Sequence, residues 1–199
     1  MNKRFTPLII LTAVALGGLT LASSKRIFNL SSRSAGTLAG PVNAALAAQF
    51  DYLSKNGNSS CSVSFKDLIV SMSDTERLRG SCCSPMSIHR YGEQVEGLKK
   101  KYAHIPEIPP DPYDIEAGLA KRLMAQYETE LTPEQQQAYD YAMEHSSEEG
   151  PCCCKCWRWY VYGGLGKLLI QKYGFTGEQV TDVWNLSDGC GGDSEHHHS

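Results

Sequence analysis

The chain has 199 residues, of which 41% are hydrophobic, and this is enough to build one ordinary globular domain rather than a disordered chain. Its 19 Lys and Arg residues against 22 Asp and Glu give a formal net charge of -3, which leaves no electrostatic footprint for DNA or RNA. We therefore expect no nucleic-acid partner. Eight cysteines are too few for a scaffold built only from disulfides, but many for an ordinary enzyme.

The N-terminus has the pattern of an export signal. Lys3 and Arg4 precede an apolar run of 15 residues, 8–22, which is the length of a signal-peptide core and short of a typical membrane span. The pattern predicts a signal peptide over 1–22 and a periplasmic or extracellular protein. The alternative is an uncleaved anchor over residues 5–24, which is the only contact with a membrane that we expect.

Composition divides the rest of the chain into three parts. Residues 23–41 are rich in Ser, Gly and Ala and predict a flexible linker. All the acidic residues lie from Asp51 onward, and all but Asp193 and Glu195 fall within a predicted helical, cysteine-rich domain over 42–190. Residues 191–199 predict a disordered tail, whose three consecutive histidines suit either metal binding or a cloning remnant.

Apolar periodicity beyond the linker is helical nearly throughout, and we find no convincing alternating run that would predict a strand. Thr132 and Thr176 open capping boxes, Gly174 ends a helix, and the proline-rich segment 104–112 is expected to run extended. These signals predict an all-α fold, a compact bundle of about five to seven short helices. The expected helices cover residues 42–53, 65–72, 88–102, 115–127, 132–145, 155–173 and 176–184.

Six cysteines fall in two tight clusters, each just before a predicted helix: Cys82, Cys83, Cys152, Cys153, Cys154 and Cys156. The positive end of a helix dipole lowers thiol pKa values, and this favours metal binding or thiol exchange. The CxxC and CxC spacings within the second cluster allow two sulfurs to reach one metal ion. Met86 and His89 lie three residues apart near the first cluster and are possible additional ligands. Such soft ligands suit Cu, Zn or a heavier thiophilic ion better than Ca or Mg.

A disulfide framework is the competing interpretation, because an even number of cysteines in an exported protein often forms disulfides. Cys61 and Cys190 are isolated and are possible disulfide partners for members of the clusters. Neighbouring cysteines pair only with strain, so each of the four thiols in the second cluster would need a distant partner. Four such partners exist, and the same count allows the two clusters to face each other around a metal centre.

Other chemistries fit the sequence less well. Covalent haem c needs CxxCH, but Trp157 follows Cys156, so no haem c is expected. A thioredoxin-like site would need strands, and no phosphate-loop or Ser/His/Asp pattern is present. We therefore predict no catalytic residues and a protein that is not an enzyme, with a thiol-disulfide redox protein centred on Cys153 and Cys156 as a further alternative.

The run Pro151-Cys152-Cys153-Cys154-Lys155-Cys156 resembles the Pro-Cys-Tyr-Cys-Gly-Cys signature of exported bacterial PCYCGC-motif proteins. Cys153 and Lys155 depart from that signature, and the match covers the motif alone. The resemblance implies an extracytoplasmic protein that handles metal or redox chemistry through clustered cysteines. The sequence thus predicts an exported soft-metal-binding protein, with a disulfide-stapled module of an envelope complex as the alternative.

Overall fold

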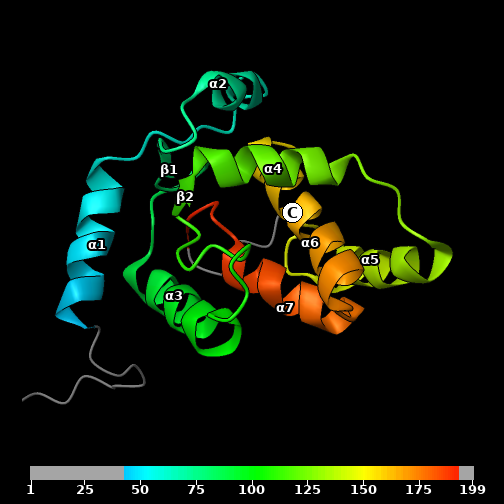
Figure 1. Cartoon of the computed structure of the whole chain (residues 1–199). Helices are drawn as coiled ribbons and strands as arrows, with labels where there is room; N and C mark the ends of the chain where they lie inside the picture. The colour runs from blue at the N-terminus through cyan, green and yellow to red at the C-terminus, as the bar shows by residue number, and fades with distance from the viewer. Residues whose placement is uncertain (1–42, 193–199) are drawn as a thin grey trace, which may run out of the picture. The chain divides into compact units, whose positions relative to one another are not determined.

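The structure, a computed structural model, describes residues 43–192 (Figure 1). The predicted signal peptide, anchor and linker, together with residues 193–199, lie outside the described residues. The described part forms seven α-helices and one small sheet, so the all-α prediction is confirmed. The elements are α1 Ala44–Lys55, α2 Phe65–Ser71, β1 Arg77–Arg79, α3 Ile88–Tyr102, β2 Asp114–Glu116, α4 Ala117–Tyr127, α5 Pro133–His145, α6 Trp157–Tyr173 and α7 Gly177–Ser187.

Helix α6 is the centre of the hydrophobic core. It packs against α4, α5 and α7, and buried side chains occur on all of its faces rather than on one stripe. Glycines in its middle allow this close packing, because a Cβ atom at Gly164 would overlap the carbonyl oxygen of Leu123 on α4. The helix ends where predicted, at Gly174 with a φ of 66°. The buried residues of α6 are Trp157, Arg158, Val161, Tyr162, Gly163, Gly164, Leu165, Gly166, Leu169 and Ile170.

The two predicted capping boxes are present and set the starts of α5 and α7. The Thr132 hydroxyl accepts the Gln135 N–H, and the Gln135 side chain accepts the Thr132 N–H in return. Thr176 and Gln179 repeat this exchange at α7. Reciprocal capping satisfies backbone donors that a helix start leaves unpaired.

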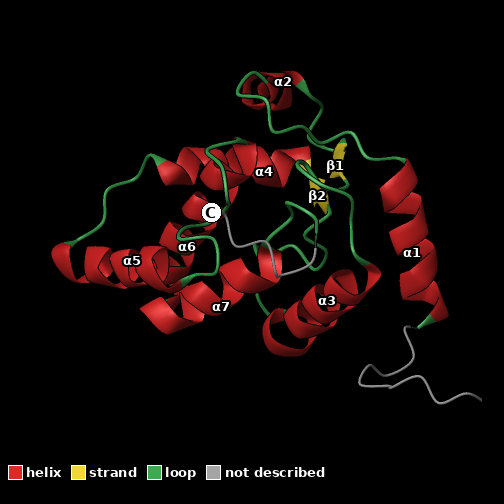
Figure 2. Cartoon of the chain, turned by 180° about the vertical axis from the view of Figure 1, so that it is seen from behind, coloured by secondary structure: helices red, strands yellow, loops and turns green. Residues whose placement is uncertain are grey.

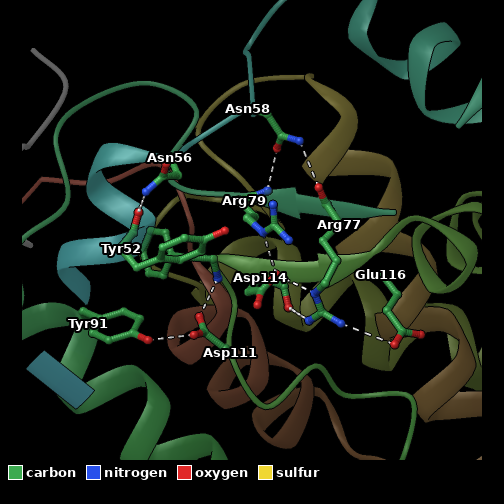
Figure 3. Close-up of polar contacts among 10 residues, drawn as sticks. Tyr52, Asn56, Asn58, Arg77, Arg79, Tyr91, Asp111, Asp114 and Glu116 are labelled. Carbon is green, nitrogen blue, oxygen red and sulfur yellow. Dashed lines mark hydrogen bonds and ion pairs between the residues drawn. The ribbon is translucent and has the colours of Figure 1, made fainter. Parts of the chain in front are cut away.

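A short sheet corrects the expectation of a strand-free fold. Strands β1 and β2 are antiparallel, with Leu78 opposite Ile115, and the Arg77 guanidinium holds Asp114 across the pair with an Nε–Oδ1 distance of 2.6 Å (Figure 3). Three-residue strands are too short to give an alternating signal. Ile115 therefore belongs to β2, and α4 begins at Ala117 instead of 115.

A second, smaller core lies beneath α1, which packs on α3 (Figure 2). Leu53, Tyr91 and Tyr113 form it, and Tyr91 donates a hydrogen bond of 2.7 Å to Asp111 (Figure 3). Asp111 belongs to the proline-rich segment, which is free of helix as predicted but consists of successive turns rather than extended chain. The turns return the chain from α3 to β2.

Among the helices of the described range 43–192, none is both long and apolar enough to cross a membrane.

The approach of α6 to α4 gives a stability prediction. Gly164→Ala should lower the free energy of unfolding by about 3 kcal/mol, because the added methyl group must displace the α4 backbone. Urea unfolding followed by circular dichroism measures this loss.

Gly92→Ala is the matched control for a helical glycine. The nearest atom to its added Cβ is a Leu46 methyl at 3.6 Å, which is ordinary contact. This change should leave stability unchanged or raise it by about 0.5 kcal/mol. Equal effects of the two substitutions would contradict the packing of α4 on α6.

Candidate metal centre

All eight cysteines converge from four separate segments of the chain. Cys61 lies between α1 and α2, and Cys82 and Cys83 lie between β1 and α3. The second cluster, 152–156, leads directly into α6, with Cys156 as its N-cap, and Cys190 follows α7. The two sequence clusters therefore meet, and the two isolated cysteines join them.

Backbone hydrogen bonds hold these segments together. The N–H groups of Cys82 and Cys83 donate to the carbonyl oxygens of Gly189 and Cys190, at 3.3 and 3.2 Å. The Cys61 thiol donates to the Cys82 carbonyl at 2.8 Å. The segment after α7 thus runs back beside the loop that follows β1 (Figure 1).

The sulfur atoms form a continuous network. Cys83 contacts Cys82 at 3.6 Å and Cys153 at 4.0 Å. Cys190 lies 2.9 Å from Cys153 and 3.3 Å from Cys152, which in turn lies 3.8 Å from Cys156. Sulfurs bound at about 2.3 Å to one tetrahedral zinc ion lie about 3.8 Å apart, so most of these separations are close to those of a metal thiolate site.

The cysteines supply all the ligand atoms of the candidate centre. Among residues 43–192, the groups of three His, Cys, Asp or Glu ligand atoms within 4.8 Å of one another consist of cysteines alone. The three groups are Cys61, Cys83 and Cys154; Cys82, Cys83 and Cys190; and Cys152, Cys153 and Cys154. Donor sets made only of thiolates select Cu(I), Zn(II) or related soft ions over Ca or Mg.

Met86 and His89 lie outside these groups. The Met86 side chain packs against the small core of Leu53, Tyr91 and Tyr113, and His89 is exposed on the first turn of α3. Their proposed role as additional ligands stays a prediction.

None of the eight cysteines is joined in a disulfide in the described chain. The shortest sulfur separation, 2.9 Å between Cys153 and Cys190, is well above a disulfide bond of about 2.05 Å. The predicted CxxC pair also points its sulfurs to different partners. Cys156 contacts Cys152, whereas Cys153 contacts Cys83 and Cys190.

A buried positive charge interacts electrostatically with the thiol network, at Cys82, Cys152 and Cys190. Arg158 is fully buried on the first turn of α6 and donates to the carbonyl oxygens of Pro112 and Gly80, at 2.6 and 3.0 Å. Its guanidinium leaves no room for a side chain at Gly189, and its Nε has no hydrogen-bond partner in the described chain. Both carbonyl partners are neutral, and the buried charge is attracted by the Asp111 carboxyl group and by Cys82, Cys152 and Cys190 when these are thiolates.

The thiols differ in acidity. The pKa of Cys82 falls to about 6. Its contact with Cys152 raises the pKa, but the contacts with Cys156 and Cys190 and the charge of Arg158 together lower it by more. Burial raises the pKa of Cys61 to about 11. The pKa of Cys156 rises to about 12, because Cys82 and burial outweigh the lowering contact with Cys152. The lowered pKa of Cys82 comes from sulfur contacts and the Arg158 charge and not from a helix start, because α3 begins only at Ile88. At Cys156, the N-cap of α6, burial and sulfur contacts raise the pKa instead.

Sequence reasoning missed Arg158. The residue lies two positions after Cys156, and an arginine on an apolar, aromatic helix face is the signal that could have identified it. A charged side chain at such a position is seldom buried without a specific role in balancing charge.

Comparison of the chain with protein-family models, with curated proteins and with solved structures found no match.

The raised thiol pKa values predict loss of stability at alkaline pH. A folded-state pKa above the unfolded value of 9.0 stabilises the fold below pH 9, and this contribution is lost as pH rises through the folded values of about 11 and 12. The lowered pKa of Cys82 has the opposite effect on stability: its stabilising contribution grows as pH rises from 6 to 9. The reduced, metal-free protein should therefore unfold at lower urea concentration at about pH 10.5 than at about pH 8.

The variant Cys61→Ser serves as the control for other groups that titrate in this range. Its loss of stability between the two pH values should be smaller than that of the parent protein. An identical loss in both proteins would contradict the raised pKa of Cys61.

Proposed function

We propose that this protein binds soft metal ions, Cu(I) in preference to Zn(II), in a thiolate cluster formed by all eight cysteines. The observation that carries the proposal is the convergence of eight thiols from four segments, with no histidine or carboxylate in the three ligand groups of the described chain. Hydrophobic packing alone gives no reason to gather every cysteine at one place.

Eight thiols exceed the needs of one ion. A tetrahedral zinc site uses four ligands, and Cu(I) is satisfied by two or three thiolates. The three groups each contain three sulfurs, and they share Cys83 and Cys154. Shared thiolates can bridge neighbouring ions, so we expect more than one Cu(I) ion per chain. This grouping in threes is the reason for placing Cu(I) before Zn(II).

The charge of Arg158 supports an anionic occupant. A cluster that contains more thiolates than monovalent copper ions carries net negative charge. The buried guanidinium lies between Gly80 and Gly189, each close in sequence to a cysteine of the network, and it raises the affinity of that region for anions. Thiolates in the network add to the attraction that Asp111 exerts on this charge, whereas neutral thiols or disulfides would not.

The proposed role is sequestration or delivery of copper outside the cytoplasm. Three features stay predictions: export, the likeness to PCYCGC-motif proteins and an envelope partner. They describe where the protein is expected to act and are not evidence for copper binding. The alternative is a disulfide-stapled module. It is favoured by the close approach of the Cys153 and Cys190 sulfur atoms, because oxidation could join this pair in a disulfide.

Anaerobic titration of the reduced, full-length protein with Cu(I), followed by native mass spectrometry, tests the proposal. We expect more than one ion per chain, retained against a competing chelator. The triple variant Cys152→Ser, Cys156→Ser, Cys190→Ser should bind fewer ions, because it removes the buried ligands.

The matched comparison is the double variant Met86→Leu, His89→Ala, which should bind copper as the parent does because neither residue belongs to the three sulfur groups. Fewer bound ions in this variant would identify the pair as additional ligands. A parent protein that retains no metal against the chelator would overturn the proposal. If protein isolated without reductant is also lighter by the hydrogens of four disulfides, the stapled module replaces it.

Arg158→Met tests the charge argument. Removal of the guanidinium should reduce the stabilisation gained on copper loading by about 3 kcal/mol, or about 6 to 12 °C in Tm. The comparison uses the Tm difference between the loaded and the metal-free forms of each protein, so that effects on the fold itself cancel.

Lys167→Met is the control on the same helix. Lys167 also donates to two backbone carbonyls, those of Tyr127 and Thr129, but it lies nine residues further along α6, about 13 Å away. Its removal should leave the gain in Tm on copper loading unchanged. An equal reduction in both variants would contradict a specific role for Arg158.

A further inference from the structure

The eight thiols of the proposed cluster differ in their access to solvent. Cys152, Cys156 and Cys190 are 2%, 2% and 6% exposed. Cys83 is exposed, and Cys61, Cys82, Cys153 and Cys154 are half-buried. The network therefore has a closed side that lies against the hydrophobic core and an open side that faces water.

The open side contains a complete set of three ligands. Cys61, Cys83 and Cys154 come from three different segments, yet their sulfur atoms all lie within 4.8 Å of one another. Three thiolates are enough to hold Cu(I) in a trigonal arrangement. Because one of the three is exposed, a sulfur atom from outside could approach an ion bound there.

The sulfur contacts continue from this group into the buried side. Cys83 lies 4.0 Å from Cys153, Cys153 lies 2.9 Å from Cys190, and Cys190 lies 3.3 Å from Cys152. Each step is short enough for one copper ion to be shared by the two sulfurs. An ion held by the open group thus has a row of ligands leading inward, whereas solvent has no comparable access to Cys152 or Cys156.

We propose that Cys61, Cys83 and Cys154 form a transfer site, where Cu(I) is exchanged with a thiolate-bearing donor or acceptor, while the buried thiols retain the metal. This inference rests on the proposed function and adds a division of labour to it. The expected partner is a copper complex of a small thiol, or a protein that presents copper on exposed cysteines.

The exchange is a ligand substitution without redox change. A thiolate of the open group forms a bond to the incoming copper ion as one copper–sulfur bond to the donor breaks. The released donor thiolate takes up the proton that the open-site cysteine gives up when it binds copper, directly or through water. Copper stays Cu(I) throughout, so no oxidant or reductant is required.

Copper uptake from a Cu(I)–glutathione complex tests this inference. The open-site variant Cys61→Ser, Cys83→Ser, Cys154→Ser should take up copper about tenfold more slowly than the parent, because it loses the one exposed thiol and the three-sulfur group around it, and only half-buried and buried thiols remain. At equilibrium it should still hold copper in its five remaining thiols. The buried-site variant Cys152→Ser, Cys156→Ser, Cys190→Ser should take up its first ion at the parent rate and then lose it faster to bathocuproine disulfonate, a Cu(I) chelator.

The single variant Cys83→Ser guards against misfolding, because this exposed side chain contributes least to packing, and circular dichroism checks the fold of each protein. It should slow uptake in the same direction. Uptake by the open-site variants at the parent rate would overturn the transfer site and leave the proposed function intact. Failure of the parent protein itself to bind Cu(I) would overturn both.

Discussion

The buried guanidinium of Arg158 is the interaction on which the arrangement of the cysteine segments depends. It bonds to the backbone at Pro112 and Gly80 and packs against Gly189, so one side chain on α6 fixes the proline-rich turns, the loop after β1 and the segment after α7. A full charge removed from water is stable only when its surroundings compensate it. The structure supplies carbonyl dipoles, the Asp111 carboxyl group and a cluster of ionisable thiols, and this requirement links the fold to the site.

Helix α6 gives the site its orientation. Its apolar faces are covered by α4, α5 and α7, and the cysteine cluster 152–156 leads directly into its N-terminus. The thiols nearest the core are therefore closed to water, while those on the loops before α2 and α3 remain accessible. The gradient of exposure across the cluster follows from attaching a cysteine-rich loop to the end of a buried helix. A protein that retains a metal ion and also exchanges it needs both environments.

Most of the fold follows from local signals. The capping boxes at Thr132 and Thr176 and the glycine at 174 depend on bonds within a few residues, and the structure forms each of them. The small sheet is different. Leu78 and Ile115 pair across 37 positions of sequence in strands of three residues, and no local pattern specifies such a contact. For the same reason the predicted start of α4 at 115 was wrong, since a buried isoleucine such as Ile115 fits a helix face and a strand equally well.

The sequence by itself determined a helical, cysteine-rich domain with one group of thiols at a helix start and another in the loop before a helix, because periodicity, capping and spacing are properties of neighbouring residues. Only the tertiary structure decided that Cys61 and Cys190 join both groups, that Met86 packs into a separate core, and that the charge of Arg158 interacts with the thiols. Those relations depend on which segments meet when α6 is buried. Proximity across long stretches of chain is set by the packing of the whole core, which no single segment encodes.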